Sequence, residues 1–288
     1  GSNSTNNILL SFDGSNEKHD YYIGLNKFVT DGISAMNDEA ITNDDDKYEN
    51  EGVVVNYGYK INENLRFESG LRYSDSFLNY DRVDVGQTDA NTNTDDTEIS
   101  YNLRLIHEDG KFKNTVVYNK TDIERATKNY LKNPSAYFGY REAINLLGEY
   151  NFNLDTKIVY GLDNEFDKAN YKDDWSGLYE TNDESIYSQY FDLQFRPLEK
   201  LYSSIGFRRD DHTTAGDYTT GRATIAYKLN NISKIRTSYG TGIRYPALYD
   251  YFYGTVVENK EELKPEKSKS FDIGYETTFE KMNMNFNI

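Results

Sequence analysis

The chain has 288 residues, of which 37% are hydrophobic and 15% aromatic, and its mean hydropathy is −0.83. Soluble domains of this size carry about 45–50% apolar residues, so a conventional core would be underfilled, while 27 tyrosines and 15 phenylalanines argue against a disordered chain. The absence of cysteine excludes disulfides, thiolate catalysis and Cys-based metal sites, and the net charge of −16 argues against nucleic acid as a partner.

Apolar and polar residues alternate along much of the chain, a period of two that marks β-strands with unlike faces. Ile99 and Tyr101, for example, alternate with Ser100 and Asn102. The pattern recurs in chain order at 53–61, 65–74, 98–105, 187–195 and 271–276. Helical spacing is weak, with one candidate at 36–50 that lacks an apolar stripe, so we expect an all-β chain of about fourteen strands.

The connections between the predicted strands alternate in length. Short turns are predicted at 62–64, 109–111, 154–156, 199–200, 230–233 and 280–281. Long polar loops are predicted at 33–50, 83–97, 131–137, 174–184, 212–219 and 246–267. Successive connections of an up-and-down barrel lie at opposite ends, so this order places short turns at one end and long loops at the other, as in transmembrane barrels.

These features together predict an antiparallel up-and-down transmembrane β-barrel, with an apolar face toward lipid and a polar face toward the lumen. The segments 112–130 and 156–174 exceed the ~9–11 residues that cross a bilayer. The many tyrosines suit the membrane interfaces, where an apolar ring and a polar tip both find partners. Soluble sandwiches, propellers and barrels are the alternative, although they typically have shorter strands and no fixed order of connections.

The most specific motif lies between residues 239 and 279, where a strand, a polar loop and a second strand follow one another. Its marker residues are Arg244, Pro246, Leu248, Tyr249, Leu263, Pro265, Glu266, Ser268, Gly274 and Glu276. The arrangement resembles the barrel signature of TonB-dependent receptors. It departs from that signature in lacking a proline after Asn259 and in carrying an acidic insert at 260–262.

Further segments extend the resemblance over most of the chain. The stretch 206–227 resembles the strand pair before the signature, and 30–48 and 73–81 resemble early barrel strands of the cobalamin-transporter branch. The resemblance implies a barrel of about twenty-two strands filled by an N-terminal plug domain, with energy supplied through TonB. We find no plug, TonB box or closing strand, so we expect residues 1–288 to form a barrel domain that is incomplete at both ends.

The same resemblance implies a metal site. In the cobalamin branch, aspartates that match Asp44, Asp46 and Asp81 look like calcium ligands that order the substrate-binding loops. Calcium takes about six to eight oxygen ligands, which clustered carboxylates supply, but no EF-hand spacing is present and a solvated acidic loop is the alternative. Calcium is the one cofactor that the sequence proposes.

No catalytic constellation is recognisable, so we do not expect an enzyme. The three histidines, His19, His107 and His212, are far apart in sequence and are interpreted as surface or lumen residues. Six arginines fall on the polar faces of predicted strands, where they would line the lumen and pair with acidic wall or plug residues: Arg66, Arg72, Arg104, Arg208, Arg222 and Arg236.

The expected function is active transport of cobalamin or another chelated nutrient across the outer membrane of a Gram-negative bacterium, through a multi-pass barrel. The expected partners are outer-membrane lipid, the TonB complex acting through the plug, and the small-molecule substrate. A siderophore receptor of the same family is the first alternative. A passive porin or structural barrel and a soluble β-rich binding or adhesion protein are the others.

Overall fold

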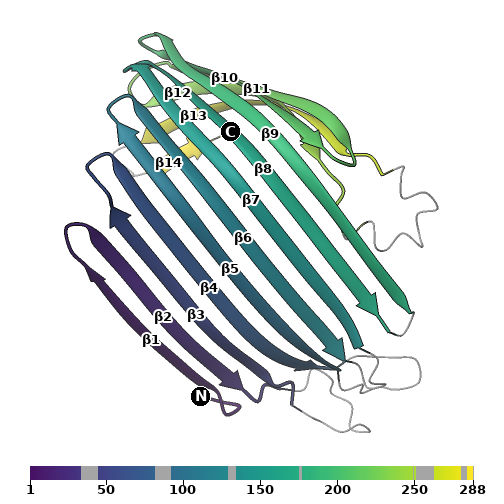
Figure 1. Cartoon of the computed structure of the whole chain (residues 1–288). Helices are drawn as coiled ribbons and strands as arrows, with labels where there is room; N and C mark the ends of the chain where they lie inside the picture. Colours follow the sequence, from purple (N-terminus) through teal and green to yellow (C-terminus); the bar gives the residue numbers. More distant parts are fainter. Residues whose placement is uncertain are drawn as a thin grey trace. The chain divides into compact units, whose positions relative to one another are not determined.

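The structure, a computed structural model, describes residues 1–33, 45–81, 92–128, 134–174, 177–248, 250, 263–279 and 284–287. Fourteen strands form one sheet whose order follows the sequence from β1 to β14 (Figure 1). They are β1 (Asn6–Ser15), β2 (His19–Thr30), β3 (Tyr48–Lys60), β4 (Leu65–Tyr80), β5 (Thr92–Asp109), β6 (Phe112–Lys128), β7 (Pro134–Asn153), β8 (Thr156–Asp173), β9 (Leu178–Leu198), β10 (Leu201–His212), β11 (Gly216–Lys228), β12 (Ser233–Arg244), β13 (Glu266–Phe279) and β14 (Met284–Asn287). The predicted all-β class, up-and-down order and strand number are confirmed. Within the described ranges, no helix is both long enough and apolar enough to span a membrane.

The contacts between residues divide the chain into two compact units. Unit 1 comprises Gly1–Leu105, Val117–Ala143 and Phe166–Asp183. Unit 2 comprises Ile106–Val116, Ile144–Glu165 and Glu184–Ile288. The expectation of a single domain over 1–288, incomplete at both ends, stays a prediction.

Unit 1 has one apolar and one polar face, because residues that lie opposite each other in antiparallel strands project from the same side. Across β1 to β4, Leu10 lies opposite Leu25, which lies opposite Val53, which lies opposite Tyr73. The next register positions form a polar row with Asn26, Gly52 and Ser74. The alternation read from the sequence is therefore in phase from strand to strand.

Unit 2 repeats this arrangement. In β9 to β13, Leu193, Ile205, Ala223, Tyr239 and Phe271 form an apolar row. The adjoining polar row contains Gln194, Ser204, Thr224, Ser238 and Asp272.

The apolar face is exposed over the part of the chain that the structure describes. Among the described residues, the hydrophobic side chains that are buried are Ala143 and Ala169, whereas Phe271 and Ile273 are 69% and 70% exposed. Removing a side chain of this size from water contributes about 1.5–3 kcal/mol. Within the described residues, this stabilisation is not gained on the apolar face.

Asparagine side chains shape four of the turns that join an odd-numbered strand to the next. Asn16 Oδ1 accepts hydrogen bonds from the Lys18 and His19 N–H groups at 2.9 Å. Similar bonds from the chain two or three residues further on reach Asn62, Asn153 and Asn230. Such side-chain bonds replace a backbone turn, which explains why these hairpins are tight. The first of them, at 16–18, is absent from the sequence-based turns.

The predicted long loops are too long, because the flanking strands extend into them. Residues 134–137 belong to β7, 178–184 to β9 and 216–219 to β11. Residues 92–97 and 48–50 are likewise strand. Most of these stretches are rich in polar residues and lack a clear apolar alternation, which resembles a loop in sequence, yet they continue the strands of the sheet. The predicted turns at 62–64, 109–111, 154–156, 199–200 and 230–233 are confirmed to within a residue, and 280–281 lies outside the described residues.

Candidate functional site

The polar face of unit 1 is held by fixed ion pairs and amide hydrogen bonds. Arg66 Nη2 donates to both carboxylate oxygens of Asp20, at 3.0 and 2.8 Å, and Arg66 Nε donates to Glu68 at 2.8 Å. Arg104 adds a bond of 3.2 Å to the other oxygen of Glu68. Charge-assisted hydrogen bonds of this kind are about twice as strong as neutral ones, so side chains of three strands, β2, β4 and β5, share one network.

The polar face of unit 2 is organised around Arg208 in β10. Its Nη1 donates to Asp163 of β8 at 3.0 Å, its Nε to Asp210 at 2.8 Å and its Nη2 to the Ser188 hydroxyl at 2.7 Å. The Tyr190 ring lies below the guanidinium at 5.4 Å. Both carboxylates are largely shielded from solvent, with side chains 12% and 6% exposed, so they depend on this single cation.

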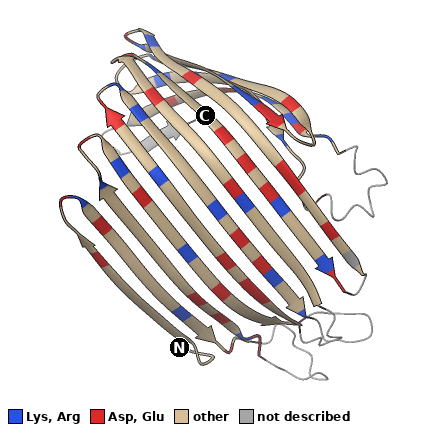
Figure 2. Ribbon diagram, viewed as in Figure 1, with Lys and Arg blue, Asp and Glu red and all other residues tan. Residues whose placement is uncertain are grey.

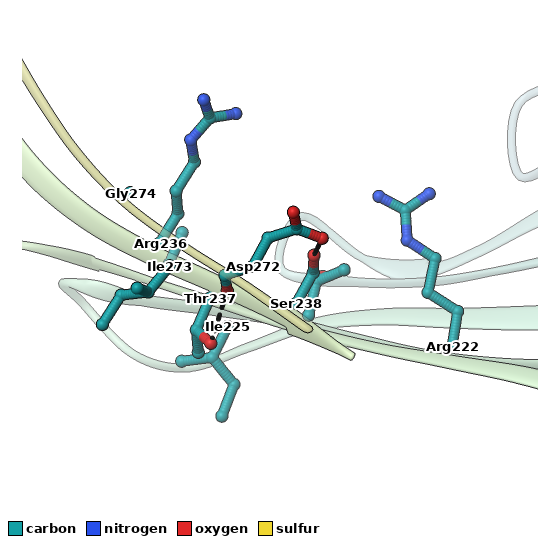
Figure 3. Close-up of a pocket in the computed structure, with 10 residues that line it drawn as sticks. Arg222, Ile225, Arg236, Thr237, Ser238, Asp272, Ile273 and Gly274 are labelled. Carbon is teal, nitrogen blue, oxygen red and sulfur yellow. Dashed lines mark hydrogen bonds between the residues drawn. The ribbon is translucent and has the colours of Figure 1, made fainter. Parts of the chain in front are cut away.

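A groove of about 580 Å³ crosses β11, β12 and β13 within unit 2. Figure 3 shows Arg222 and Arg236 pointing to the same side as Asp272, whereas Ile225 points to the other. Asp272 accepts a hydrogen bond of 3.3 Å from Ser238. Neither arginine has an ion-pair partner within the described ranges, so two guanidinium groups remain able to receive carboxylate or phosphate groups.

His212, the last residue of β10, joins several elements. Its Nδ1 accepts hydrogen bonds from the backbone N–H groups of Thr214 and Ala215, both at 3.2 Å. Its Nε2 lies 3.4 Å from a Glu184 oxygen, and the Tyr245 ring lies over the imidazole with centroids 4.4 Å apart. The residue is 1% exposed. His212 was interpreted as a surface or lumen residue. It lies on the same face of β10 as Arg208 and Asp210, but it is buried there, since Tyr245 and the turn after β10 cover it.

The electrostatics of this cluster lower the pKa of the imidazole. His212 follows eleven residues of β10, a length that already crosses a bilayer of ~9–11 residues. Burial lowers its pKa from 6.5, and the charge of Asp210 offsets part of this effect. Burial, reinforced by the Asp210 charge, also raises the pKa of the neighbouring Tyr245 to about 12. Because Nδ1 accepts two N–H groups, a proton on that nitrogen would break both hydrogen bonds.

The signature residues form two neighbouring antiparallel strands and their flanks. Arg244 lies opposite Glu266 and Gly242 opposite Ser268. A Cβ atom on Gly242 would approach Ser268 Oγ to 2.7 Å, so a larger residue there would require the Ser268 hydroxyl to move. Glu276 pairs with Lys234 at 3.0 Å, and Gly274 lies opposite Arg236.

The remaining signature residues flank these strands. Pro246 and Leu248 follow β12, where Ala247 and Asp250 exchange two hydrogen bonds of 2.8 and 2.9 Å that begin a turn. Leu263 and Pro265 precede β13. Tyr249 lies outside the described residues.

The structure places two of the three calcium candidates. Asp46 lies just before β3, with its carbonyl oxygen against Gly32, and Asp81 directly follows β4. The connections that carry them are adjacent, since Asn79 N–H donates to the carbonyl of Lys47 at 2.8 Å. Asp44 lies outside the described residues. Over the described part of the chain, no group of three or more His, Cys, Asp or Glu side chains is arranged to hold a metal ion.

Sequence analysis missed the partners rather than the faces. All six arginines lie on polar faces as expected. The sequence did not identify Asp163 as the partner of Arg208, or Tyr245 as the residue that packs on His212. The alternation in 156–173 could have placed Asp163 on the polar face, because it puts Asp163 and Asp167 on one side of the strand. No local pattern signals the contact of Tyr245 with His212.

Comparison with known proteins agrees with this architecture. The family model described as TonB dependent receptor-like, beta-barrel matches residues 2–288. The vitamin B12 transporter BtuB of Photobacterium profundum is 22% identical over 256 residues, which are 89% of this chain and 41% of the transporter.

Solved structures show the same fold. The copper transporter OprC superposes with a TM-score of 0.74 at 16% identity, over 96% of this chain and 50% of OprC. The siderophore receptor PirA from Pseudomonas aeruginosa gives 0.69 at 14% identity, over 96% of this chain and 49% of PirA. The chain thus spans about half the length of the proteins that it matches. Since the family model covers nearly every residue, the chain belongs to the TonB-dependent receptor-like β-barrel family.

Proposed function

We propose that the protein containing this chain is an active transporter of the outer membrane that imports cobalamin or a similar chelated nutrient. The observation that carries the proposal is the separation of faces. Apolar rows such as Leu193, Ile205 and Tyr239 lie uncovered on one side, and charged networks lie on the other. In a family of TonB-dependent receptor-like barrels, these faces suit lipid outside and a hydrated passage inside.

The chemistry of the polar face supports a passage for polar molecules. Most charged side chains on this face form ion pairs, as at Arg66 and Arg208, so they stabilise the sheet and are less available to bind a ligand. Arg222 and Arg236, described above, are two exceptions, and they offer contacts to anions along the polar face of unit 2. The transport energy would come from TonB, acting on parts of the protein outside this chain.

Cobalamin is the preferred substrate because the vitamin B12 transporter is the relative found by sequence. A ferric siderophore is the alternative within the same family, since a siderophore receptor is among the similar structures. A calcium site formed by Asp44, Asp46 and Asp81 would accompany the cobalamin assignment. The nearness of the connections that carry Asp46 and Asp81 supports it.

The test is binding and uptake by the full-length protein. Purified protein in detergent is titrated with labelled cobalamin and with a labelled ferric siderophore, each with calcium and with a chelator. We expect tight, calcium-dependent cobalamin binding, weakened about tenfold by Asp44→Ala with Asp46→Ala. Tight siderophore binding without cobalamin binding would show that the substrate is a siderophore. Unchanged cobalamin affinity in the double variant would contradict the proposed calcium site.

Energy coupling separates this proposal from a passive barrel. Uptake of the bound substrate is measured in cells with and without TonB. We expect uptake to stop without TonB, whereas equal uptake in both strains would indicate a porin. Recovery of the protein in aqueous buffer without detergent would contradict the membrane assignment and favour a soluble binding or adhesion protein.

A further inference from the structure

A tight turn of three residues, 213–215, joins β10 to β11, because His212 lies directly opposite Gly216. The turn is attached to β9 as well. The Thr213 N–H group donates to the Ser185 carbonyl at 3.0 Å, and the Thr213 hydroxyl accepts from the Ser185 N–H group at 3.0 Å. Figure 2 shows acidic residues at the ends of β10 and β11 that this turn joins. The turn and these attachments lie entirely within unit 2.

The His212 ring closes this turn in the way that an asparagine closes another. Its Nδ1 accepts the N–H groups two and three residues further on, those of Thr214 and Ala215, at 3.2 Å. In the turn between β11 and β12, Asn230 Oδ1 accepts the N–H groups two and three residues further on, at 2.9 Å. Because Nδ1 of histidine and Oδ1 of asparagine are both bonded to Cγ, the imidazole nitrogen takes the place of the amide oxygen.

The two acceptors differ in their response to protons. An amide oxygen stays an acceptor over the ordinary pH range, whereas an imidazole takes up a proton near neutrality. Because Nδ1 of His212 accepts hydrogen bonds, the proton of the neutral ring is carried by Nε2. A second proton must enter at Nδ1, where it removes the acceptor of both backbone N–H groups. The bonds that close this turn therefore exist only while His212 is neutral.

Two carboxylates face the imidazole. A Glu184 oxygen of β9 lies 3.4 Å from Nε2 of His212. Asp210 lies two residues before His212 on the same face of β10, and its negative charge favours the imidazolium. The Arg208 guanidinium, bound to Asp210 at 2.8 Å, opposes it. An imidazolium formed here would keep a partner for Nε2, whereas its Nδ1–H group would face two N–H donors.

Aromatic rings cover the imidazole. The Tyr245 ring lies over it with centroids 4.4 Å apart, and Tyr218 of β11 lies against Tyr245 at 6.0 Å. Lys267 of β13 lies over the Tyr218 ring at 4.7 Å and adds a positive charge on this side. His212 is 1% exposed, and burial disfavours the imidazolium more than Asp210 favours it, so the pKa of His212 is below 6.5. Protonation is therefore coupled to opening of the cover and of the turn.

We propose that His212 is a proton-sensitive switch at the β10–β11 turn. In its neutral form the imidazole closes the turn at 213–215 and packs against Tyr245. A proton taken from solvent onto Nδ1 breaks both backbone hydrogen bonds and releases the turn together with Tyr245. Since Tyr245 directly follows β12 and precedes Pro246 of the signature, the change extends to the segment after β12. The switch involves groups of unit 2 alone and does not rest on the membrane placement or on the transported substrate.

The test is hydrogen exchange of the full-length protein in detergent, with protection factors compared because they remove the pH dependence of the intrinsic exchange rate. With a pKa of about 6.5 for the exposed imidazole, the equilibrium should shift about tenfold toward the open turn between about pH 7.5 and about pH 5.5. We expect the protection of the Thr214 and Ala215 amides to fall by that factor. Unchanged protection of these amides would overturn the proposal.

The turn between β11 and β12 is the matched internal control. The Ile232 and Ser233 amides donate to Asn230 Oδ1, which does not titrate in this range. We expect their protection factors to be the same at both pH values. An equal fall in the two turns would show a general loosening by acid and would rule out a switch at His212.

Two variants separate the proton from the packing. His212→Asn keeps an acceptor at the same position, so the protection of the turn should lose its pH dependence. If the fall of about tenfold persists in this variant, another group takes up the proton and the proposal is wrong. Tyr245→Ala removes the cover, so the turn should open more readily and its protection should fall already at the higher pH. Unchanged protection in Tyr245→Ala would contradict the part that the proposal gives to Tyr245.

Discussion

Replacing Arg208 with alanine removes the one cation shared by two shielded carboxylates. Asp163 and Asp210 then lie on the sheet without a counter-charge, and Ser188 loses its donor. Breaking a buried pair by deleting one partner costs about 3–5 kcal/mol. The Arg208 side chain is 39% exposed, so water offsets part of the loss and we expect about 3 kcal/mol.

The neighbouring residue supplies the control. Arg209 pairs with Asp217 from the opposite face of β10, with both side chains more than half exposed. Exposed pairs contribute about 0–1 kcal/mol, so Arg209→Ala should be nearly neutral. The free energy of unfolding is measured for the full-length protein by urea titration in lipid vesicles, followed by far-UV circular dichroism.

A second variant distinguishes lost charge balance from lost packing. Converting Asp163 and Asp210 to asparagine in the Arg208→Ala background removes the uncompensated charges, and it should recover at least half of the lost stability. The reasoning is refuted if Arg208→Ala is no less stable than Arg209→Ala. No recovery in the triple variant would assign the loss to packing of Arg208 on Tyr190 instead.

Two further changes test the geometry of the connections. At Gly32, φ is +73° and a Cβ would lie 2.0 Å from the Asp46 carbonyl oxygen, so Gly32→Ala should lower the free energy of unfolding by at least about 2 kcal/mol. Gly110→Ala is the control and should cost less, because Gly110 also has a positive φ but has open space around it. Equal thermal midpoints for the two variants would contradict the close approach at Gly32. At His212, the folded state holds the imidazole neutral while the unfolded chain takes up a proton as the pH falls through 6.5, so the free energy of unfolding should fall below that pH. His212→Asn keeps an acceptor and should abolish this loss between about pH 7 and 5; an unchanged pH dependence would assign it to another group.

The strand pattern and the two faces were readable from the sequence, because side chains alternate with a period of two in any strand. The phase of Ile99, Tyr101 and Leu103 is a local property that pairing does not alter. Hairpin turns were readable for a similar reason, since Asn62, Asn153 and Asn230 bond to the chain a few residues away.

Strand ends were harder to place, because pairing with a neighbouring strand decides them. Residues 178–184 are polar and read as a loop, yet they form the first third of β9. Beyond the membrane band both faces of a strand are wet, so the apolar alternation that reveals a strand is lost there.

The sequence by itself determined that this chain is a two-faced, up-and-down sheet with a receptor signature at 239–279. Only the tertiary structure decided which side chains meet. Arg208 and Asp163 are 45 positions apart, and their contact follows from the register of β8, β9 and β10. Register is set by the matching of whole apolar faces and by the turns that join the strands, so it is not apparent from the residues around Arg208 or Asp163 alone. For the same reason the contact between Tyr245 and His212 has no signal in the sequence.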